Sequence, residues 1–472
     1  MSPAGLSPLF MPLPESLPSD SDGKGQLEEL HLAGTNDDSS AIERMDITVD
    51  ISDNPSSSEL NERVAALFNQ IFAPELAVNA SQVSLRQMSG AMSSRVYIAT
   101  IDPAPTVPMA WAPRMLRAST EKHYRIGIKH NQETIQMPRK YILRFYGTGA
   151  DELLSREKEL YWLSQLTSLG VGPQMYGIFG NGRWEEFLES ITLDKDNMRL
   201  ASTSKHIARR MCELHSLVSC YRPFGSAKPS DKDAKYLNGQ PELWAKVDSL
   251  MQLMQHKWPQ VRNKCDSNPQ CAELLNNWPT VVQAINKFRA HVEREVHSPV
   301  VFTHNDLQYG NILRMERTGK LEIVDFEFAG HNYRGYDIAN HFCEWMVDYY
   351  HPEHPHLLDP ALYPTNKQRH TFLRAYIRAK TFIDVNMKAN AGIVESDSAQ
   401  PVKIRTVRLS KDQIRQEVAE LDREVALFVT ASHLHWGMHG LLKACCCEIG
   451  FDYVSYAAQR LSMFLSQVAD LQ

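Results

Sequence analysis

The sequence predicts an α+β protein with a small N-terminal lobe built on an antiparallel sheet and a large, mainly helical C-terminal lobe. Short apolar segments separated by turn residues occupy residues 83–188, as expected for antiparallel strands. After residue 192 the apolar residues recur mostly at helical spacing. Hydrophobic residues make up 43% and charged residues 22% of the 472 residues, which is the composition of an ordinary globular chain.

The charge balance excludes several classes of partner. The chain has 50 Lys and Arg against 56 Asp and Glu, a net charge of −6, which favours neither nucleic acid nor an anionic membrane. No apolar run is long enough to span a membrane, and residues 1–17 lack the basic start and apolar core of a secretory leader. We therefore expect a cytoplasmic protein. The spacing of its eight cysteines forms no zinc pattern, and cysteines in the cytoplasm are expected to be reduced.

Composition divides the chain into three parts. Residues 1–58 are rich in Ser, Pro, Asp and Glu and are predicted to be a disordered acidic tail. Residues 59–192 form the expected N-terminal lobe, and residues 193–472 form the helical lobe. Two stretches are interpreted as insertions: one near residues 102–135, which begins with a Pro- and Ala-rich segment, and a polar one at residues 389–408.

The N-terminal lobe is expected to begin with a helix over residues 60–68. Alternating or apolar segments then predict strands, and a helical segment capped by Ser155 interrupts them. The expected strands are 83–88, 95–101, 141–146, 175–178 and 184–188, and the helix is 151–169. The last two strands flank Asn181-Gly182, a strong hairpin signal.

Helical periodicity dominates the C-terminal lobe. The expected helices are 206–218, 241–255, 271–297, 367–386, 411–443 and 454–469. Three short strands are expected between them, at 300–302, 312–315 and 321–325.

The most informative segment is residues 301–313, in which two apolar runs bracket a polar loop. The loop contains His304, Asp306 and Asn311, and an apolar strand then leads to Asp325. A carboxylate, an amide and a second carboxylate in this order are what Mg²⁺-dependent phosphoryl transfer requires. A single Asp in a loop is usually a turn residue, but the composite spacing makes that interpretation improbable here.

Residues 304–313, 323–328 and 332–346 closely resemble the choline/ethanolamine kinase family, most of all its fungal-type choline kinases. The resemblance extends over about residues 82–464, apart from the insertions. It implies a bilobal, eukaryotic protein kinase-like fold. It also implies transfer of the γ-phosphoryl group of ATP to the hydroxyl group of an amino alcohol.

The resemblance assigns roles within the polar loop and after it. Asp306 is expected to be the catalytic base, and Asn311 and Asp325 are expected to hold Mg²⁺. Gln308 matches a position that contacts the nucleotide. Glu327 would hold a second Mg²⁺ through water, or would form a surface ion pair instead. His304 is expected to brace the loop by hydrogen bonding rather than to react.

The N-terminal lobe is expected to bind ATP. A loop of small residues between two strands would cover the phosphates, although alone it could be a plain hairpin turn: Ser89, Gly90, Ala91, Met92, Ser93, Ser94 and Arg95. Arg144 would contact the phosphates and pair with Glu159, unless it is an exposed arginine on an edge strand. The backbone of Glu186, Phe187 and Leu188 would contact adenine.

A quaternary ammonium substrate needs aromatic faces and a nearby carboxylate. Family positions that line this pocket, beside Asp306, match Glu344, Tyr349, Trp436, His439 and Tyr456. Without the resemblance, most of these aromatic residues would be interpreted as core. Glu344 and Tyr349 are expected on one helical stretch, and His439 stands where animal choline kinases have a second Trp.

These features predict an ATP- and Mg²⁺-dependent choline kinase that also acts on ethanolamine and supplies phosphatidylcholine synthesis. An ethanolamine-preferring kinase and a non-catalytic kinase-like binding protein are the alternatives. Retention of Asp306, Asn311 and Asp325 together argues against the second of these. A protein kinase is disfavoured because no Ala-Pro-Glu segment follows Asp325. The sequence leaves open whether the chain forms a homodimer.

Overall fold

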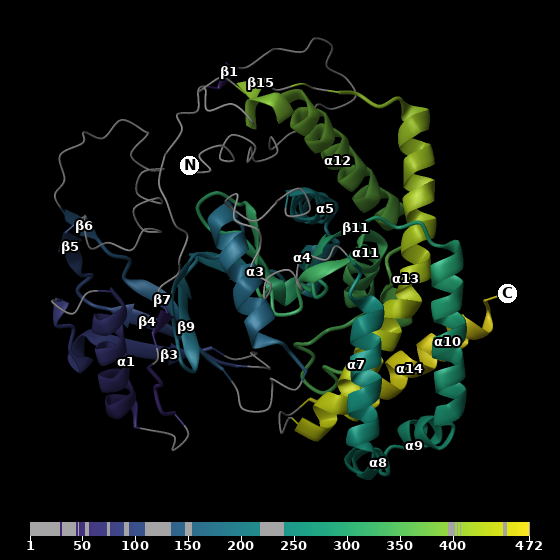
Figure 1. The fold of residues 1–472 in the computed structure, drawn as a ribbon, viewed down its shortest axis with the longest axis horizontal. Coiled ribbons are helices and arrows are strands. Elements are labelled where there is room, and N and C mark those ends of the chain that lie inside the picture. The colour runs from purple at the N-terminus through teal and green to yellow at the C-terminus, as the bar shows by residue number, and fades with distance from the viewer. Residues whose placement is uncertain are drawn as a thin grey trace. The chain divides into compact units, whose positions relative to one another are not determined.

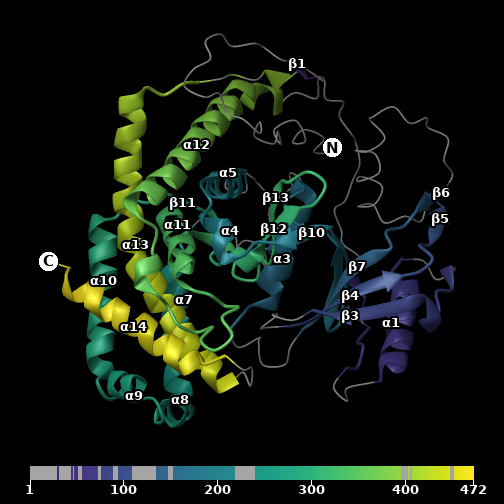
Figure 2. The same ribbon diagram turned by 180° about the vertical axis from the view of Figure 1, so that it is seen from behind.

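The computed structural model describes residues 29–30, 44–45, 47–51, 56–72, 76–88, 94–108, 134–146, 153–217, 240–394, 402–403, 405, 407–446 and 451–471. These residues form two compact units, shown as ribbons in Figures 1 and 2. Unit 2 comprises Ser39–Glu152 and Leu163–Glu189. Unit 1 comprises Met1–Asp38, Leu153–Trp162 and Ser190–Gln472, so helix α3 (Arg156–Leu169) is shared between the two.

Unit 2 is built on a six-stranded sheet in the order β2-β8-β9-β7-β4-β3. The strands are β2 (Arg44–Met45), β3 (Val83–Gln87), β4 (Ser94–Ile101), β7 (Lys140–Tyr146), β8 (Met175–Phe179) and β9 (Gly182–Glu186), and a separate hairpin joins β5 (Thr106–Pro108) and β6 (Thr134–Gln136). Helix α1 (Ser57–Phe72) packs on one face, where Phe68 meets the rings of Tyr141 and Trp184 at 5.5 and 5.7 Å between centroids. The predicted antiparallel strands and the Asn181-Gly182 hairpin are confirmed.

Residues 44–45 and 47–51, which lie within the predicted disordered tail, are placed on unit 2. Strand β2 pairs with β8 in parallel, and Val49 is 5% exposed within the core of unit 2. The side chain of Asn181 accepts a hydrogen bond from the Val49 N–H and donates one to the Val49 carbonyl, at 3.0 and 2.7 Å. Composition did not reveal this segment, because it has only a few apolar residues among acidic and polar ones. Those apolar residues, Ile47, Val49 and Ile51, are the ones that pack on the core of unit 2.

Unit 1 is mainly helical. Its helices are α4 (Lys195–Arg199), α5 (Ala201–Leu217), α7 (Leu243–His256), α8 (Trp258–Cys265), α9 (Pro269–Asn276), α10 (Trp278–Glu295), α11 (Arg334–Cys343), α12 (Asn366–Val394), α13 (Lys411–Cys446) and α14 (Tyr453–Ala469). Figures 1 and 2 show the long α13 running beside α12 and crossing α14. Helix α11 packs on α13, which places the residues after β14 against the core of this unit.

The strands of unit 1 are short and are distributed over three small sheets. One sheet has the order β10-β12-β13, and two further pairs are β11–β14 and β1–β15. Their bounds are β1 (Glu29–Leu30), β10 (Ser190–Thr192), β11 (Val300–Thr303), β12 (Ile312–Met315), β13 (Leu321–Ile323), β14 (Gly330–Tyr333) and β15 (Val402–Lys403). Strand β15 and the last turns of α12 fall within residues 389–408, which the sequence predicts to be an insertion without periodicity.

Residues 271–297 form two helices, α9 and α10, instead of the single helix that their periodicity predicts. Pro279 lies in the first turn of α10, where its missing N–H costs nothing, but it could not continue α9. Pro259 has the same place in α8, a helix that the sequence analysis missed. Both prolines signal these helix starts in the sequence.

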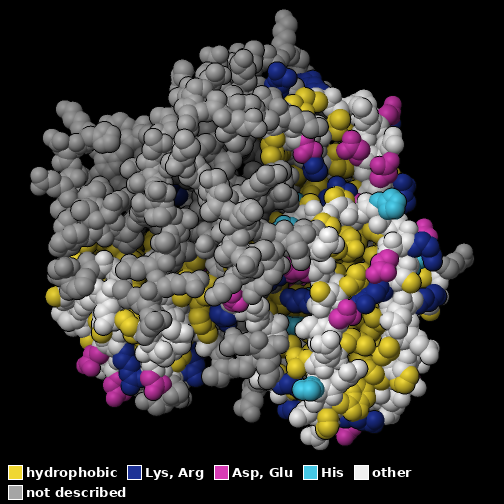
Figure 3. Space-filling view, in the orientation of Figure 1, with side chains coloured by type: hydrophobic (Ala, Val, Ile, Leu, Met, Phe, Trp, Pro, Cys, Tyr) yellow, Lys and Arg dark blue, Asp and Glu magenta, His cyan; other side chains and the backbone are white. Residues whose placement is uncertain are grey.

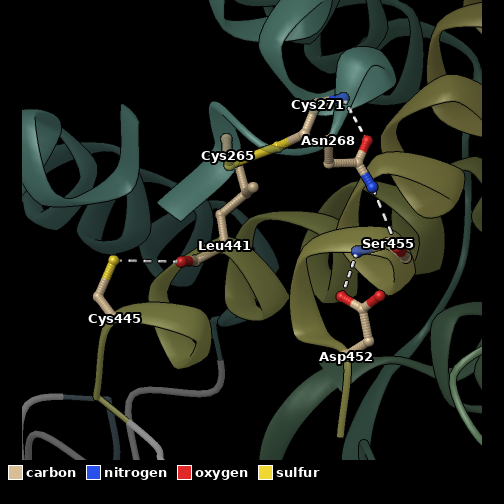
Figure 4. The surroundings of a disulfide bond; sticks show 7 residues. All are labelled: Cys265, Asn268, Cys271, Leu441, Cys445, Asp452 and Ser455. Atoms are coloured by element: carbon tan, nitrogen blue, oxygen red, sulfur yellow. Dashed lines mark hydrogen bonds between the residues drawn. A yellow bond between two sulfur atoms is a disulfide. The ribbon is translucent and has the colours of Figure 1, made fainter. Parts of the chain in front are cut away.

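The prediction that all cysteines are reduced is wrong for Cys265 and Cys271. They form a disulfide between the end of α8 and the first turns of α9, where the short connection holds their Cα atoms 5.4 Å apart (Figure 4). Between them, Asn268 caps α9 and donates a hydrogen bond to Ser455 of α14 at 3.0 Å. Cys212 and Cys343 are free and buried, as predicted, and burial raises the pKa of Cys212 to about 12.

Acidic and basic side chains are interspersed on the face in Figure 3, among the residues coloured there. Neither sign gathers into one large patch over the described part of this face, in keeping with the small net charge of −6. Among the described helices, none combines the length and the apolar character that crossing a membrane requires.

Candidate active site

The polar loop after β11 is anchored by one buried carboxylate. Asp337 of α11 is fully buried and accepts hydrogen bonds from the backbone N–H groups of His304 and Asn305, at 3.0 and 2.7 Å. The imidazole Nε2 of His215, on α5, lies 2.9 Å from the same carboxylate. Burial alone would raise the pKa of Asp337, but the hydrogen bond with His215 and those from the backbone N–H groups hold it below its usual value. The loop is therefore fixed to α11.

Asn305 and His304 complete the internal bonding of the loop. Asn305 has φ of 64°, and its side chain bonds to Thr303, Phe328 and Asn332 at 2.9 to 3.0 Å. Short polar side chains tolerate this left-handed backbone best. His304 lies 3.0 Å from the Val324 carbonyl through Nε2, and its Nδ1 accepts the Asp306 N–H at 3.3 Å. Because burial lowers the pKa of His304, the ring is neutral and braces the loop, as predicted.

Asp306, Gln308 and Asn311 lie together in this loop. The amide Nδ2 of Asn311 donates to the backbone carbonyl of Asp306 at 2.8 Å and to its carboxylate Oδ2 at 3.1 Å. Gln308 accepts the Gly310 N–H at 2.6 Å and thereby closes the 3₁₀ turn Tyr309–Asn311. The amide nitrogen of Asn311 bonds to Asp306, so its amide oxygen points to the other side. Gln308 Nε2 lies 3.4 Å from that oxygen.

Three acidic side chains act on the predicted base, Asp306. Burial raises the pKa of Asp306 well above its usual value, and the charges of Glu344, Glu327 and Asp325 raise it further. Asp325 follows β13 with φ of 66°, a left-handed conformation that is uncommon for residues other than Gly and is frequent at functional sites. This concentration of negative charge is suited to cations, such as a divalent metal or an ammonium group.

Glu344, one of the residues predicted to contact the substrate, is buried and has two hydrogen-bond partners. It is 1% exposed, and it accepts hydrogen bonds from Arg460 Nη2 at 2.9 Å and from Tyr349 Oη at 2.7 Å. The expected single helix from Glu344 to Tyr349 is wrong, because Glu344–Met346 is a 3₁₀ turn and Val347 then pairs with Leu358. The turn still brings Tyr349 back onto Glu344. Tyr349 also donates its N–H to Tyr309 Oη at 2.6 Å.

Arg460 of α14 is a site residue that the sequence analysis missed. It is fully buried, and its guanidinium lies 5.1 Å from the ring centroid of Tyr456, one helical turn earlier. An arginine on the apolar face of an otherwise apolar helix was the available signal, since such a group requires a buried partner. Tyr456, Tyr349 and Trp436 pack in one hydrophobic cluster, so the structure brings the predicted aromatic residues together.

One asparagine joins the pocket to the loop. Asn340 of α11 donates to the Asn305 carbonyl at 3.1 Å, and its Oδ1 accepts from Trp436 Nε1 at 2.7 Å. The position of the Trp436 ring is thus set relative to the polar loop. Neither Asn340 nor Asp337 was identified as a site residue from the sequence, because their partners are tens of residues away in the chain.

His439 packs edge-on against two aromatic rings. Its ring centroid lies 5.4 Å from that of Trp436 and 5.5 Å from that of Phe328. The side chain is 4% exposed, and no described residue forms a hydrogen bond with its Nδ1. Burial and the neighbouring His435, Lys443 and Lys246 lower the pKa of His439 well below its usual value. The imidazole is therefore neutral, and its Nδ1 is buried without a hydrogen-bond partner among the described residues.

The predicted nucleotide contacts are divided between the two units. Residues 89–93 of the phosphate-covering loop lie outside the described residues, while Ser94 and Arg95 begin β4. Arg144 lies on β7, an interior strand, and its side chain is 12% exposed and bonds to Glu185 at 3.3 Å, so it is not an exposed edge-strand arginine.

Glu159 is 2% exposed and bonds to Arg156. A pair between Arg144 and Glu159 would join the two units and stays a prediction. Glu186 ends β9 and accepts the Gln174 N–H at 3.1 Å, which leaves Phe187 and Leu188 in the connector after the strand.

Comparison with known proteins identifies the relatives of this chain. A family model for choline/ethanolamine kinase matches residues 114–465. The choline/ethanolamine kinase of Homo sapiens is 32% identical over 338 residues, which are 71% of this chain and 74% of the human protein. The choline kinase of Schizosaccharomyces pombe is 28% identical over 345 residues, covering 70% of this chain and 69% of the relative. The crystal structure of a Cryptosporidium parvum choline kinase matches with a TM-score of 0.58 and 18% identity, over 86% of this chain and 95% of that chain.

Proposed function

Because the chain belongs to the choline/ethanolamine kinase family, we propose that it transfers the γ-phosphoryl group of ATP to the hydroxyl group of choline, forming phosphocholine. The observation that carries this proposal is the group of four carboxylates, Asp306, Asp325, Glu327 and Glu344, beside a cluster of aromatic rings. Carboxylates and aromatic faces are what a metal-bound nucleotide and a quaternary ammonium need together. The product would serve phosphatidylcholine synthesis, and we place the reaction in the cytoplasm.

The reacting atoms would be handled by Asp306. The hydroxyl oxygen of the substrate attacks the γ-phosphorus while the bond to ADP breaks, and the hydroxyl proton passes to the Asp306 carboxylate. The raised pKa of Asp306 makes this carboxylate a stronger proton acceptor than a solvated aspartate. Its hydrogen bond from Asn311, at 3.1 Å, fixes which oxygen faces the hydroxyl group.

The residues present fit Mg²⁺. The Asn311 amide oxygen and the Asp325 carboxylate are hard oxygen ligands, and Glu327 would add a ligand through water. When bound there, Mg²⁺ would neutralise charge on the phosphates of ATP during transfer. Asn311 suits this role because its amide nitrogen is held by Asp306, which orients the oxygen away from the base.

The remaining proposed contacts are with ATP. We assign the phosphates to the loop from Ser89 to Arg95 and to Arg144, with Glu159 as the partner of the arginine. We assign adenine to the backbone of Glu186, Phe187 and Leu188, and a further nucleotide contact to Gln308. The position of Arg144 on an interior strand, where its side chain is 12% exposed, supports this assignment.

Choline would bind with its ammonium against Tyr349, Trp436 and Tyr456 and beside Glu344. Ethanolamine is the second candidate substrate, favoured by His439. A primary ammonium can donate a hydrogen bond to the buried Nδ1 of this neutral imidazole, and a trimethylammonium group cannot. Dimerisation would not be required, because the base, the metal ligands and the pocket residues all lie in one unit.

The test is a coupled ATP-turnover assay with choline and ethanolamine side by side, at fixed Mg²⁺. We expect turnover with both amino alcohols and none above background for Asp306→Asn. Nucleotide binding without turnover of either substrate would instead favour a non-catalytic kinase-like binding protein. Turnover of ethanolamine with little turnover of choline would identify the ethanolamine-preferring alternative.

A further inference from the structure

Lys246 is a basic residue that lies next to the aromatic residues of the predicted ammonium pocket. It lies in the first turn of α7, where its N–H donates to the Glu242 carbonyl at 2.9 Å, and its side chain is half-buried. The ammonium Nζ lies 4.6 Å from the ring centroid of Phe328. The same ring packs against Trp436 at 5.1 Å and against His439 at 5.5 Å. The chain thus places its own ammonium group on an aromatic cluster that includes two of the proposed substrate contacts.

Charged and titratable groups of α3, of α13 and of the proposed catalytic segments interact electrostatically with Lys246. Glu242 precedes it on α7 and forms an ion pair with Lys158 of α3, while the negative charges of Glu327 and Asp306 act from the proposed catalytic segments. His435 and His439 face it from α13. Within the described residues, no carboxylate comes within ion-pair distance of the Lys246 ammonium. The carboxylates of the site therefore stabilise this charge only at longer range.

Both charge states of Lys246 are accessible near neutral pH. Burial and the charge of Lys158 lower the pKa of Lys246 to about 8, although Glu242, Glu327 and Asp306 favour the protonated form. His435 and His439 do not share the charge, because burial holds the pKa of each well below its usual value. Of Lys246, His435 and His439, it is therefore Lys246 whose charge changes between pH 7 and pH 9.

We propose that Lys246 is an affinity-determining residue of the amino-alcohol site, where its positive charge opposes the positive charge of the substrate. Two cations that share one set of carboxylates and rings disfavour each other. This inference rests on the proposed function, since it takes the substrate to be a cation. It assigns Lys246 no part in the chemistry.

The test compares Lys246→Met, a neutral side chain of similar length, with the matched control Lys246→Arg, which keeps the charge at every working pH. Choline is the substrate of choice because its own charge does not titrate. At pH 7 and saturating Mg²⁺ and ATP, Lys246→Met should lower the KM of choline about three- to tenfold, and Lys246→Arg should leave it near the wild-type value.

The pH profile gives a readout that a merely structural role would not change. Lys246 is protonated below pH 8 and neutral above it, so the wild-type KM of choline should fall between pH 7 and pH 9 toward that of Lys246→Met. The KM of Lys246→Arg should stay high over the same range. Other groups titrate equally in all three proteins, so the difference between their profiles isolates Lys246.

Direct titration of choline by calorimetry separates this inference from the proposed function. Tighter choline binding by Lys246→Met in a protein without turnover would support the inference and overturn the proposed reaction. Equal choline affinity in wild type and Lys246→Met, in a protein that turns over choline, would overturn the inference alone. A raised KM for ATP in Lys246→Met with unchanged choline affinity would also overturn it, because Lys246 would then serve the nucleotide.

Discussion

Asp306 combines a catalytic advantage with an electrostatic cost to the fold. Burial and the charges of Glu344, Glu327 and Asp325 disfavour its ionised form, so Asp306→Asn should raise the thermal midpoint of the metal-free protein. It should also reduce turnover by about 10²- to 10⁴-fold, the usual contribution of a positioned base. Thermal unfolding in metal-free buffer and the coupled assay measure the two effects.

The pH dependence of this stabilisation follows from the sign of the shift. The folded state holds the pKa of Asp306 above its unfolded value, so the protonated form is favoured on folding and wild-type stability falls as pH rises through that pKa. The advantage of Asp306→Asn should therefore grow with pH and vanish in acid. Asp412, whose side chain is 88% exposed, provides the control: Asp412→Asn should change neither quantity. A pH-independent difference would contradict the electrostatic explanation.

Arg460 should matter for stability as well as for the pocket. Arg460→Met leaves the Glu344 carboxylate buried without its guanidinium partner, and breaking a buried pair in this way costs about 3–5 kcal/mol of unfolding free energy. The matched control is Arg415→Met, which breaks an ion pair with Asp412 whose side chains are 74% and 88% exposed and should cost less than about 0.5 kcal/mol. Chemical denaturation followed by circular dichroism measures both. Equal losses in the two variants would show that Glu344 does not need Arg460.

His439 should influence which amino alcohol is preferred. His439→Trp adds a cation–π face for choline and removes the nitrogen available to ethanolamine. The choline-to-ethanolamine ratio of kcat/KM should therefore rise about 2- to 30-fold. Because burial holds the pKa of His439 well below its usual value, we expect no contribution of its protonation to that ratio between pH 6 and pH 8. His256→Trp, at an exposed position on α7, is the control. A ratio unchanged in His439→Trp would show that the ring faces away from the substrate.

At the scale of residues, the sequence predicted what depends on short spacing. His304, Asp306, Asn311 and Asp325 lie within a segment of about twenty residues, and the loop geometry of Asp306 and Asn311 follows from their order. Arg460 and Lys246 were missed because their roles arise from packing between distant helices. Spacing along the chain carries no record of such contacts.

At the scale of elements, residues 44–51 should contribute measurably to the stability of unit 2. Deleting residues 1–51 removes β2, the buried Val49 side chain and both Asn181 hydrogen bonds. We expect a loss of at least about 2–3 kcal/mol, from burial of one valine and two hydrogen bonds. Deleting residues 1–43 is the matched control and should cost much less. Thermal unfolding compares them, and equal midpoints would mean that residues 44–51 do not stabilise the sheet.

Helix and strand types were predicted better than their ends. Strands β3, β4 and β7 have clear apolar patterns, and each was placed within one residue of its observed start. The prediction of a single helix over residues 271–297 was wrong at Pro279. The apolar periodicity continues through this residue, but a proline cannot lie in the interior of a continuous helix. Composition likewise concealed β2, because two strand residues in an acidic segment give no detectable pattern.

At the scale of the whole molecule, metal binding should be visible as stability. Mg²⁺ relieves the repulsion among the site carboxylates, and a ligand at 100 times its Kd stabilises the folded state by about 2.7 kcal/mol. We expect Mg²⁺ alone to raise the thermal midpoint of wild type, and Asp325→Asn to lose most of that rise. Asp412→Asn should keep it. A full Mg²⁺ response in Asp325→Asn would exclude Asp325 as a principal ligand.

The division into a sheet-based part and a helical part was predictable from the change of periodicity near residue 192, and the structure separates its units at residues 189 and 190. The membership of residues 153–162 in unit 1 was not predictable. They belong there because of contacts such as the ion pair between Lys158 and Glu242, 84 residues apart. Local sequence does not encode partners at such separations.

Helix α11 holds the loop that carries the proposed catalytic base. Asp337 and Asn340 tie the loop that carries the proposed base to this helix, whereas His439 and Tyr456 project from α13 and α14. Substitutions on those two helices can alter which amino alcohol fits while the base and its anchors keep their positions. During evolution, substrate preference can therefore change while the catalytic residues and the reaction stay the same.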